Sequence, residues 1–227
     1  MRLIKPSIEF LWITPEPLET IEKAGRTCYK SEDKIASTSA ERFVQKLLMK
    51  GHFAMIEHAS ASYRVVCDRG VTHEIVRHRL FSYAQESTRY CDYKGGVTFI
   101  IPPWIVVPGK LLNSEVEFDD EGFLEFSHST LRKCVQYAGS TYVWFCLLQR
   151  AERAYKVLRD KDWTPQQARS VLPNALKTEI VITGNLREWL HFFKLRTAKT
   201  AHPQMQEIAN MLLEDIRSRV SVIFDEL

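Results

Sequence analysis

Residues 77–90, RHRLFSYAQESTRY, place three arginines, one histidine, two serines and two tyrosines within fourteen positions. Guanidinium and hydroxyl groups are side chains that bind phosphate well. Within this segment, Ser87, Thr88 and Arg89 combine a hydroxyl, consecutive backbone amides and a guanidinium fork, which is a compact pattern for a phosphomonoester. We therefore expect a local anion site here.

Arg77, His78 and Arg79 form a second basic group in the same segment. On a helix, consecutive side chains point about 100° apart, so these three would fan over most of the circumference. They cannot all bind one phosphate, and they must face solvent or contact more than one partner. An ordinary solvated basic turn is the alternative for the triplet alone.

Residues 185–202, NLREWLHFFKLRTAKTAH, hold a second cluster of basic and aromatic side chains. Arg187 and His191 follow one helical stripe, and Arg196 comes one turn after Phe192, beside the apolar face. Such a cluster can frame a planar heterocycle. The interpretation that we favour from the residues alone is an amphipathic core helix with basic edges.

Metal and nucleophile chemistry find little support in the sequence. The segment HEIVRH at 73–78 places His73 and His78 five residues apart, about 140° around a helix, whereas metal-binding pairs lie four apart and about 40° apart. Ser87 lies in no G-x-S-x-G elbow. The chain contains neither of two glycine-rich phosphate-binding motifs, G-x-G-x-x-G and G-x-x-x-x-G-K-(S/T). We expect no metal site, and we expect side chains and helix ends to hold any nucleotide.

The composition is that of a globular protein, with 227 residues, 45% hydrophobic, and a net charge of only +3. That charge, together with six acids and no base over 113–125, argues against a nucleic-acid binder. The longest apolar run, Tyr142–Leu148, is far shorter than the roughly 20 residues of a membrane helix. Five cysteines without a C-x-x-C pair and no signal-peptide pattern predict a cytoplasmic protein without a disulfide framework.

Hydrophobic periodicity predicts helices and strands in mixed order. Capping patterns mark helix starts at Thr38 with Glu41, at Thr164 with Pro165 and Gln167, and at Asn185 with Glu188. The predicted strands span 58–69, 97–104 and 177–184; the predicted helices span 41–50, 71–80, 127–159, a short stretch after Pro165 carrying a surface Arg169, 186–198 and 203–224. We expect a single α+β domain with several helices around a small central sheet.

The string formed by 77–79, Ser87 and Arg89 matches R-H-R-x7-S-x-R, and on this signature the chain resembles the flavin-dependent thymidylate synthases. The resemblance covers the whole chain, 1–227. Three further segments are similar to motifs of that family: GHFAMIEH at 51–58, ARSVLP at 168–173 and GNLREWLHFFKLR at 184–196.

The resemblance implies a homotetramer with active sites at subunit interfaces, each binding FAD and dUMP. The implied reaction transfers a methylene from 5,10-methylenetetrahydrofolate to carbon 5 of dUMP, and a hydride from NADPH-reduced FAD completes the methyl group. The products would be dTMP and tetrahydrofolate. No nucleic acid and no membrane would take part.

The resemblance also assigns site residues. The implied FAD site comprises Arg77, His78, Arg79, Gln85, Glu57, His52, Asn185, Arg187, His191 and His202. The implied dUMP site comprises Glu74, Arg77, Gln85, Glu86, Ser87, Thr88, Arg89, Arg169 and Arg196, with Arg169 reaching the nucleotide from a neighbouring subunit.

Two of these residues are assigned to catalysis. By resemblance Arg196 lies against the uracil and stabilises negative charge that develops at N3 and O2, an electrostatic role. For Ser87 we expect phosphate binding and orientation of the transition state rather than covalent attack, because no base lies near it in sequence.

Some positions depart from the family pattern. Glu74 stands where many relatives have glutamine, and a carboxylate there would repel anionic dUMP unless it is protonated or paired. Ala54 replaces a threonine that contacts FAD in a relative. The spacing from Arg196 to His202 is longer than in some relatives.

Two other classes of function compete with this one. The first is a nucleotide- or flavin-binding regulatory protein that has kept the fold and lost the chemistry. The second is a small RNA-binding domain, which predicts a broad basic surface and an affinity that falls steeply with salt. The small net charge and the acidic run argue against the second.

Overall fold

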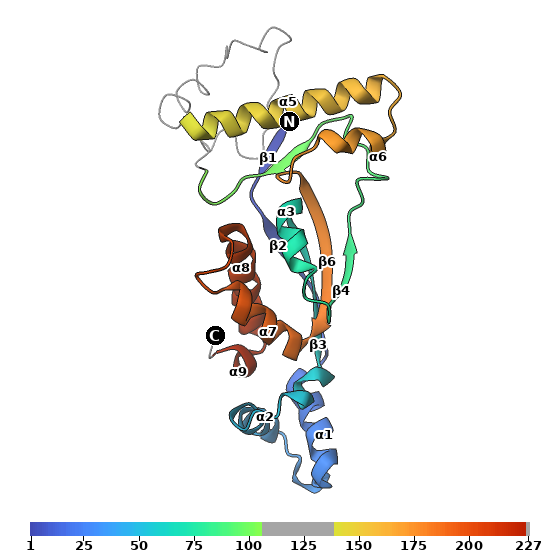
Figure 1. The fold of residues 1–227 in the computed structure, drawn as a ribbon. Coiled ribbons are helices and arrows are strands. Elements are labelled where there is room, and N and C mark those ends of the chain that lie inside the picture. The colour runs from blue at the N-terminus through green and yellow to red at the C-terminus, as the bar shows by residue number, and fades with distance from the viewer. Residues whose placement is uncertain (106–138, 226–227) are drawn as a thin grey trace. The chain divides into compact units, whose positions relative to one another are not determined.

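The computed structural model describes residues 1–105 and 139–225, and its ribbon is drawn in Figure 1. The chain separates into two compact units, which are treated individually below. The first unit comprises Met1–Pro6, Cys67–Gly70 and Gln85–Thr178. The second unit comprises Ser7–Val66, Val71–Ala84 and Glu179–Leu227.

The first unit is built on a small parallel strand pair. Strand β1 (Arg2–Ile4) pairs with β5 (Thr98–Ile100), and Leu3 lies opposite Phe99. The predicted strand over 97–104 is thus confirmed in its first part and ends before Pro102, which has no N–H to donate to a ladder. Leu3 and Phe99 are fully buried and form a core cluster with apolar residues of the following helix.

That helix is α5 (Gly139–Asp160), and it buries one face at helical spacing. Phe145, Leu148 and Tyr155 lie on this face and are almost completely buried. The helix confirms the later part of the prediction over 127–159. Residues 127–138, the acidic run at 113–125 and Cys134 lie outside the described residues.

Helix α6 (Pro165–Ala168) and the 3-10 turn η4 (Arg169–Val171) follow α5 in the first unit. The predicted capping box at Thr164 is confirmed: the backbone N–H of Thr164 donates to Oε1 of Gln167 at 2.8 Å. Pro165 occupies the first helical position, where its missing N–H costs nothing. These local signals place Arg169 at the end of a short, well-defined helix.

A four-stranded sheet in the order β2-β3-β6-β4 lies mainly in the second unit. Its strands are β2 (Ser7–Ile13), β3 (Ser60–Asp68), β6 (Lys177–Asn185) and β4 (Ser82–Gln85). The predicted strand is confirmed, and Ala61, Tyr63 and Val65 are fully buried as expected. The alternation holds only in part, because Ser62 and Asp68 are buried too.

Helices α7 (Leu186–Arg196) and α8 (Pro203–Arg219) pack against each other in the second unit. The predicted cap is confirmed at the start of α7, where Oδ1 of Asn185 accepts the N–H of Glu188 at 2.9 Å. The helix predicted over 203–224 is interrupted at Val220, whose φ is −143°, and α9 (Ser221–Phe224) follows.

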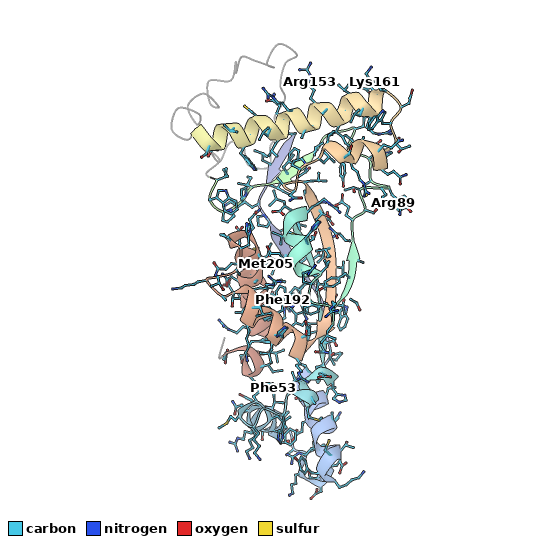
Figure 2. All side chains as sticks on the ribbon, viewed as in Figure 1. Phe53, Arg89, Arg153, Lys161, Phe192 and Met205 are labelled. Atoms are coloured by element: carbon cyan, nitrogen blue, oxygen red, sulfur yellow. The ribbon has the colours of Figure 1, made fainter. Side chains whose placement is uncertain are left out.

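An aromatic core joins α7 to the sheet. Trp189, Phe192 and Phe193 are fully buried, and Figure 2 labels Phe192 among these packed side chains. Trp189 also packs on Phe81, with ring centroids 4.6 Å apart. A Cβ on Gly184 would lie 2.0 Å from Cδ1 of Phe81, so only glycine fits there. These aromatic residues are therefore core, as the residues alone favoured, and do not frame a heterocycle.

The second unit also contains α1 (Pro17–Tyr29), η1 (Glu32–Lys34), α2 (Ser39–Met49) and η2 (Phe53–His58). The predicted capping box at Thr38 is wrong, because the Thr38 side chain makes no cap hydrogen bond. The hydroxyl of the next residue, Ser39, accepts the N–H of Ala36 at 2.9 Å and donates to Glu22 at 2.8 Å.

The end of α2 agrees with the sequence. Gly51 has a φ of 70°, and the N–H of His52 donates to the carbonyl of Leu47 at 2.9 Å, so a glycine closes the helix in the left-handed conformation. Helices and small sheets together confirm the α+β class. The assignment of 1–227 to one domain stays a prediction.

Two further findings concern only the described residues. No helix within 1–105 or 139–225 is both long and apolar enough to cross a membrane. In the same ranges the cysteines are free thiols, at Cys28, Cys67, Cys91 and Cys146.

Candidate functional site

The basic triplet lies in a turn of the second unit. Helix α3 (Arg69–Ile75) ends before Arg77, so the interpretation of the triplet as a helical fan is wrong. Phe81 donates its N–H to the carbonyl of His78 at 3.1 Å, and the Tyr83 hydroxyl lies 2.7 Å and 2.8 Å from the carbonyl oxygens of Ile75 and His78. These bonds fix the turn.

The turn separates the three side chains in another way. Arg77 and Arg79 are exposed, whereas His78 is only 6% exposed. The two guanidinium groups are therefore accessible to a ligand, whereas the imidazole is enclosed by the protein. The predicted contact of His78 with FAD stays a prediction, and the side chain already has neighbours on both ring nitrogens.

Those neighbours define the state of His78. Its Nε2 accepts the Nε–H of Arg196 at 2.9 Å, so the ring proton lies on Nδ1, which is 3.5 Å from Oε1 of Glu188. The ring packs on Phe192 at 5.0 Å and on His191 at 5.8 Å between centroids. Burial, the adjacent Arg196 cation and His191 lower the pKa of His78 to about 4, so the imidazole is neutral at pH 7.

Arg196 is the last residue of α7 and is held on two further sides by Glu74 of α3. Its Nη1 lies 2.9 Å from Oε2 of Glu74, and its Nη2 donates to the main-chain oxygen of Glu74 at 3.2 Å. Glu74 is thus paired, which removes the repulsion of anionic dUMP that an unpaired carboxylate would cause. The Arg196 side chain keeps 20% of its surface exposed.

Other residues assigned to FAD also lie in the second unit. Arg187, at the start of α7, pairs with Glu57 of η2, and both are about half exposed. Asn185 uses its amide oxygen for the cap of α7. His52, His191 and His202 are exposed, and His202 is the N-cap residue of α8. The structure thus brings Glu57 to Arg187 and His191 to His78.

The phosphate pattern lies in the first unit, because the division between the units falls after Ala84. The hydroxyl of Ser87 accepts the N–H of Arg89 at 3.3 Å, and the Ser87 carbonyl accepts the N–H groups of Tyr90 and Cys91. The segment is therefore a tight turn, and the Arg89 guanidinium is exposed at its surface (Figure 2).

Two hydrogen bonds orient the arginines at this turn: one holds Arg89 of the turn, and the other holds Arg169 of η4 beside it. The Nε–H of Arg89 donates to Oε1 of Gln166 at 3.3 Å. Arg169, which is exposed as expected, donates from Nη1 to the hydroxyl of buried Thr88 at 2.9 Å. Arg169 and the phosphate pattern are thus adjacent within one chain, while the implied reach of Arg169 to a neighbouring subunit's nucleotide stays a prediction.

The two residues before Ser87 already have partners. Glu86 lies 2.9 Å from Nζ of Lys177 and accepts the Tyr93 hydroxyl at 2.7 Å, so its charge is balanced beside the anion site. Gln85 donates to the Thr178 hydroxyl at 3.3 Å.

Sequence reasoning missed Gln166, Lys177 and Tyr93 as supports of this turn. It noted Glu188 only as a capping residue, and not as the carboxylate beside His78. Some of these contacts join residues close in sequence, such as Glu86 and Tyr93, which are 7 positions apart, and others join distant ones, such as His78 and Glu188, which are 110 positions apart. No local pattern encodes the distant ones.

The described ranges also lack a ligand set of the kind that metal ions need. Within them, no group of three His, Cys, Asp or Glu side chains could hold an ion.

The chain is similar to proteins of known family. Residues 9–220 match the family model of the thymidylate synthase complementing protein. A flavin-dependent thymidylate synthase of Mycolicibacterium vanbaalenii is 33% identical over 209 residues, which cover 91% of this chain and 78% of that protein.

Two solved structures share the fold. Thymidylate synthase X from Helicobacter pylori with FAD and dUMP has a TM-score of 0.73 and 20% identity, covering 97% of this chain and 98% of that one. A UMP/dUMP methylase from Streptomyces cacaoi bound with 5-Br dUMP has a TM-score of 0.72 and 22% identity, covering 99% and 96%. By its sequence match over nearly its whole length, this chain belongs to the family of thymidylate synthase complementing proteins, the flavin-dependent thymidylate synthases.

Proposed function

We propose that the protein methylates carbon 5 of dUMP reductively, with 5,10-methylenetetrahydrofolate as one-carbon donor and NADPH as the reductant of FAD. The products are dTMP, tetrahydrofolate and NADP⁺, and one proton is consumed in the balance. The proposal includes a cytoplasmic homotetramer with active sites at subunit interfaces. The observation that carries it is the presence, on one segment, of two distinct groups that suit anions: exposed Arg77 and Arg79, and the turn at 87–89.

The side chains of the second unit fit FAD. The cofactor carries a diphosphate, and exposed guanidinium groups bind phosphate oxygens in a bidentate manner. Arg77, Arg79 and Arg187 are exposed, as are the imidazoles of His52 and His191. When bound, FAD reduced by NADPH supplies the hydride.

The turn at 87–89 fits the phosphate of dUMP. Exposed Arg89 supplies a guanidinium that Gln166 already orients, and Arg169, which donates to Thr88 in its own chain, would supply a second one to the nucleotide of a neighbouring subunit. The hydroxyl of Ser87 adds a short hydrogen-bonding group. Preoriented donors bind with less loss of conformational freedom, so this turn suits a dianionic phosphate.

Arg196 is the residue that we assign to the uracil. A fixed guanidinium stabilises charge that develops on a substrate oxygen more strongly than water does, because it does not need to reorient. Ser87 would keep the nucleotide in place for this step. Its hydroxyl accepts the Arg89 N–H, which agrees with a binding role.

The test is whether the purified protein takes up FAD and makes dTMP. We expect a yellow protein whose oxidised-flavin absorption shifts on addition of dUMP. We expect dTMP to form only when 5,10-methylenetetrahydrofolate and NADPH are both present. UMP should be run beside dUMP, because one structural neighbour is a methylase of both.

The inactive regulatory alternative gives a different result. It predicts the same yellow protein and the same shift with dUMP, without dTMP under any reducing condition. A colourless protein that takes up no FAD would contradict both readings.

A further inference from the structure

Three acceptors surround the guanidinium of Arg196 in the second unit. Its Nε donates to the His78 imidazole at 2.9 Å, Nη1 lies 2.9 Å from the Glu74 carboxylate, and Nη2 donates to the Glu74 carbonyl at 3.2 Å. A guanidinium has five N–H groups, so two remain for a substrate. Glu74 provides two of the three acceptors, from α3, while Arg196 lies at the end of α7.

We propose that Glu74 is a positioning residue, which holds the Arg196 guanidinium in one orientation so that its two remaining N–H groups face the substrate. The proposal rests on the proposed function, in which Arg196 acts on the uracil. An arginine without such supports samples many rotamers and must lose that freedom at each turnover. The two bonds from one residue, to its side chain and to its main chain, remove most of that freedom in advance.

The negative charge of Glu74 has a second effect. A charged acceptor forms a stronger hydrogen bond to a guanidinium than a neutral amide does. It also balances the charge of Arg196 before substrate binds. A glutamine at this position would keep an acceptor oxygen and lose the balance.

His78 supports the same orientation only while it is neutral. A protonated imidazole has no lone pair for the Nε–H of Arg196 and would place a second cation beside it. The charged and titratable groups that face the His78 ring are Arg196, Glu188 and His191. The Tyr83 hydroxyl bonds to the main-chain oxygen of His78, and Phe81 and Phe192 pack on the ring. Because Arg196 is the cation next to the ring, the pKa of His78 depends on where the Arg196 guanidinium lies.

The first experiment measures the pKa of His78 by NMR on the protein itself, in the wild type, in Glu74→Ala and in Glu74→Gln. Burial, and after it the Arg196 cation, lower the pKa of His78 in the wild type. If Glu74 positions Arg196, the pKa rises in Glu74→Ala because the arginine leaves the imidazole, and Glu74→Gln restores most of the wild-type value.

The opposite sign overturns the proposal. If Arg196 stays in place without Glu74, removal of a nearby negative charge leaves the pKa of His78 unchanged or lowers it. Glu9→Ala is the matched control, since Glu9 pairs with Arg64 at an exposed position of the same unit and should leave His78 unchanged. This result does not depend on enzyme activity, so it separates failure of this inference from failure of the proposed function.

The second experiment measures kcat and KM for dUMP. We expect Glu74→Ala to lower kcat about 100-fold, which is the scale of a misplaced catalytic group, with FAD uptake retained. The kcat of Glu74→Gln should lie within about tenfold of wild type. The glutamine keeps a hydrogen-bond acceptor for Arg196 and loses only the extra strength that the carboxylate's charge gives to that bond.

A double-mutant cycle tests whether Glu74 acts through Arg196. In the Arg196→Ala background, Glu74→Ala should change kcat by less than about twofold, because its target is gone. Multiplicative losses in the double variant would overturn the positioning role.

Discussion

At the scale of single residues, the site depends on contacts that neutralise or orient charge. Glu74 and His78 hold Arg196, and Lys177 balances Glu86 beside the phosphate turn. The sequence identified Arg196 and Glu86 through their resemblance to family motifs. It did not predict the supports, because Lys177 lies 91 residues from Glu86 and no spacing rule connects them.

Arg89 provides a test at this scale. Arg89→Ala removes the exposed guanidinium at the phosphate turn, and a hydrogen bond to a charged group contributes about 1.5–3 kcal/mol. We expect the affinity for dUMP to fall roughly 10- to 100-fold, with FAD uptake retained. Titration of the flavin absorption with dUMP measures this change.

Lys161→Ala is the control for Arg89, because Lys161 is also an exposed cation of the first unit (Figure 2). It should leave the dUMP affinity unchanged. Equal affinity in Arg89→Ala and wild type would remove Arg89 from the phosphate site.

At the scale of elements, local signals predicted most helix starts correctly and failed at Thr38 and after Ile75. Asn185 and Thr164 cap their helices as expected. Thr38 does not, because its backbone, with a φ of −122° and a ψ of 12°, lacks the extended conformation of a capping residue. The helix predicted over 71–80 ends early because a neighbouring element intervenes. The turn after Ile75 is closed by the hydroxyl of Tyr83, which belongs to strand β4.

The two caps provide a matched pair of variants. Asn185→Ala removes the bond to Glu188, and loss of an N-cap costs about 1 kcal/mol, so the free energy of unfolding should fall by about that amount. Thr38→Ala removes a side chain that makes no cap bond, and it should leave stability within about 0.5 kcal/mol of wild type. Urea unfolding followed by circular dichroism measures both values.

A loss in Thr38→Ala as large as that in Asn185→Ala would contradict the assignment of the caps. FAD uptake by Asn185→Ala is a separate observation. It shows whether this residue acts on the cofactor beyond starting α7.

At the scale of the whole molecule, the resemblance covers more than local patterns do. The family match spans 9–220, while periodicity and capping patterns predicted the α+β class, the long β3 and β6 strands and the buried face of α7. The sequence did not predict that the segment 77–90 is shared between two compact units, because division into units depends on contacts over the whole chain.

The free energy of unfolding depends on pH wherever a buried group has a different pKa in the folded and the unfolded chain. His78 has a pKa of about 4 in the folded protein and near 6.5 when unfolded, so between these values the unfolded chain binds more protons. The free energy of unfolding should therefore decrease as pH falls from about 6.5 to 4, by up to about 3 kcal/mol from this residue.

Urea unfolding at a series of pH values in wild type and in His78→Gln measures this contribution as the difference between the two slopes. Burial raises the pKa of Glu188, whose effect on stability has the opposite sign, so the comparison with the variant isolates His78. Parallel slopes in the two proteins would show that His78 is not a buried neutral imidazole.

The pairing of Arg196 with Glu74 has a consequence for the choice of inhibitors. An acidic compound aimed at this arginine brings a second carboxylate next to Glu74, and the two like charges repel each other. A compound with a neutral carbonyl uses the two remaining N–H groups without that repulsion. At this arginine a neutral compound should therefore be favoured over an acidic compound of similar size.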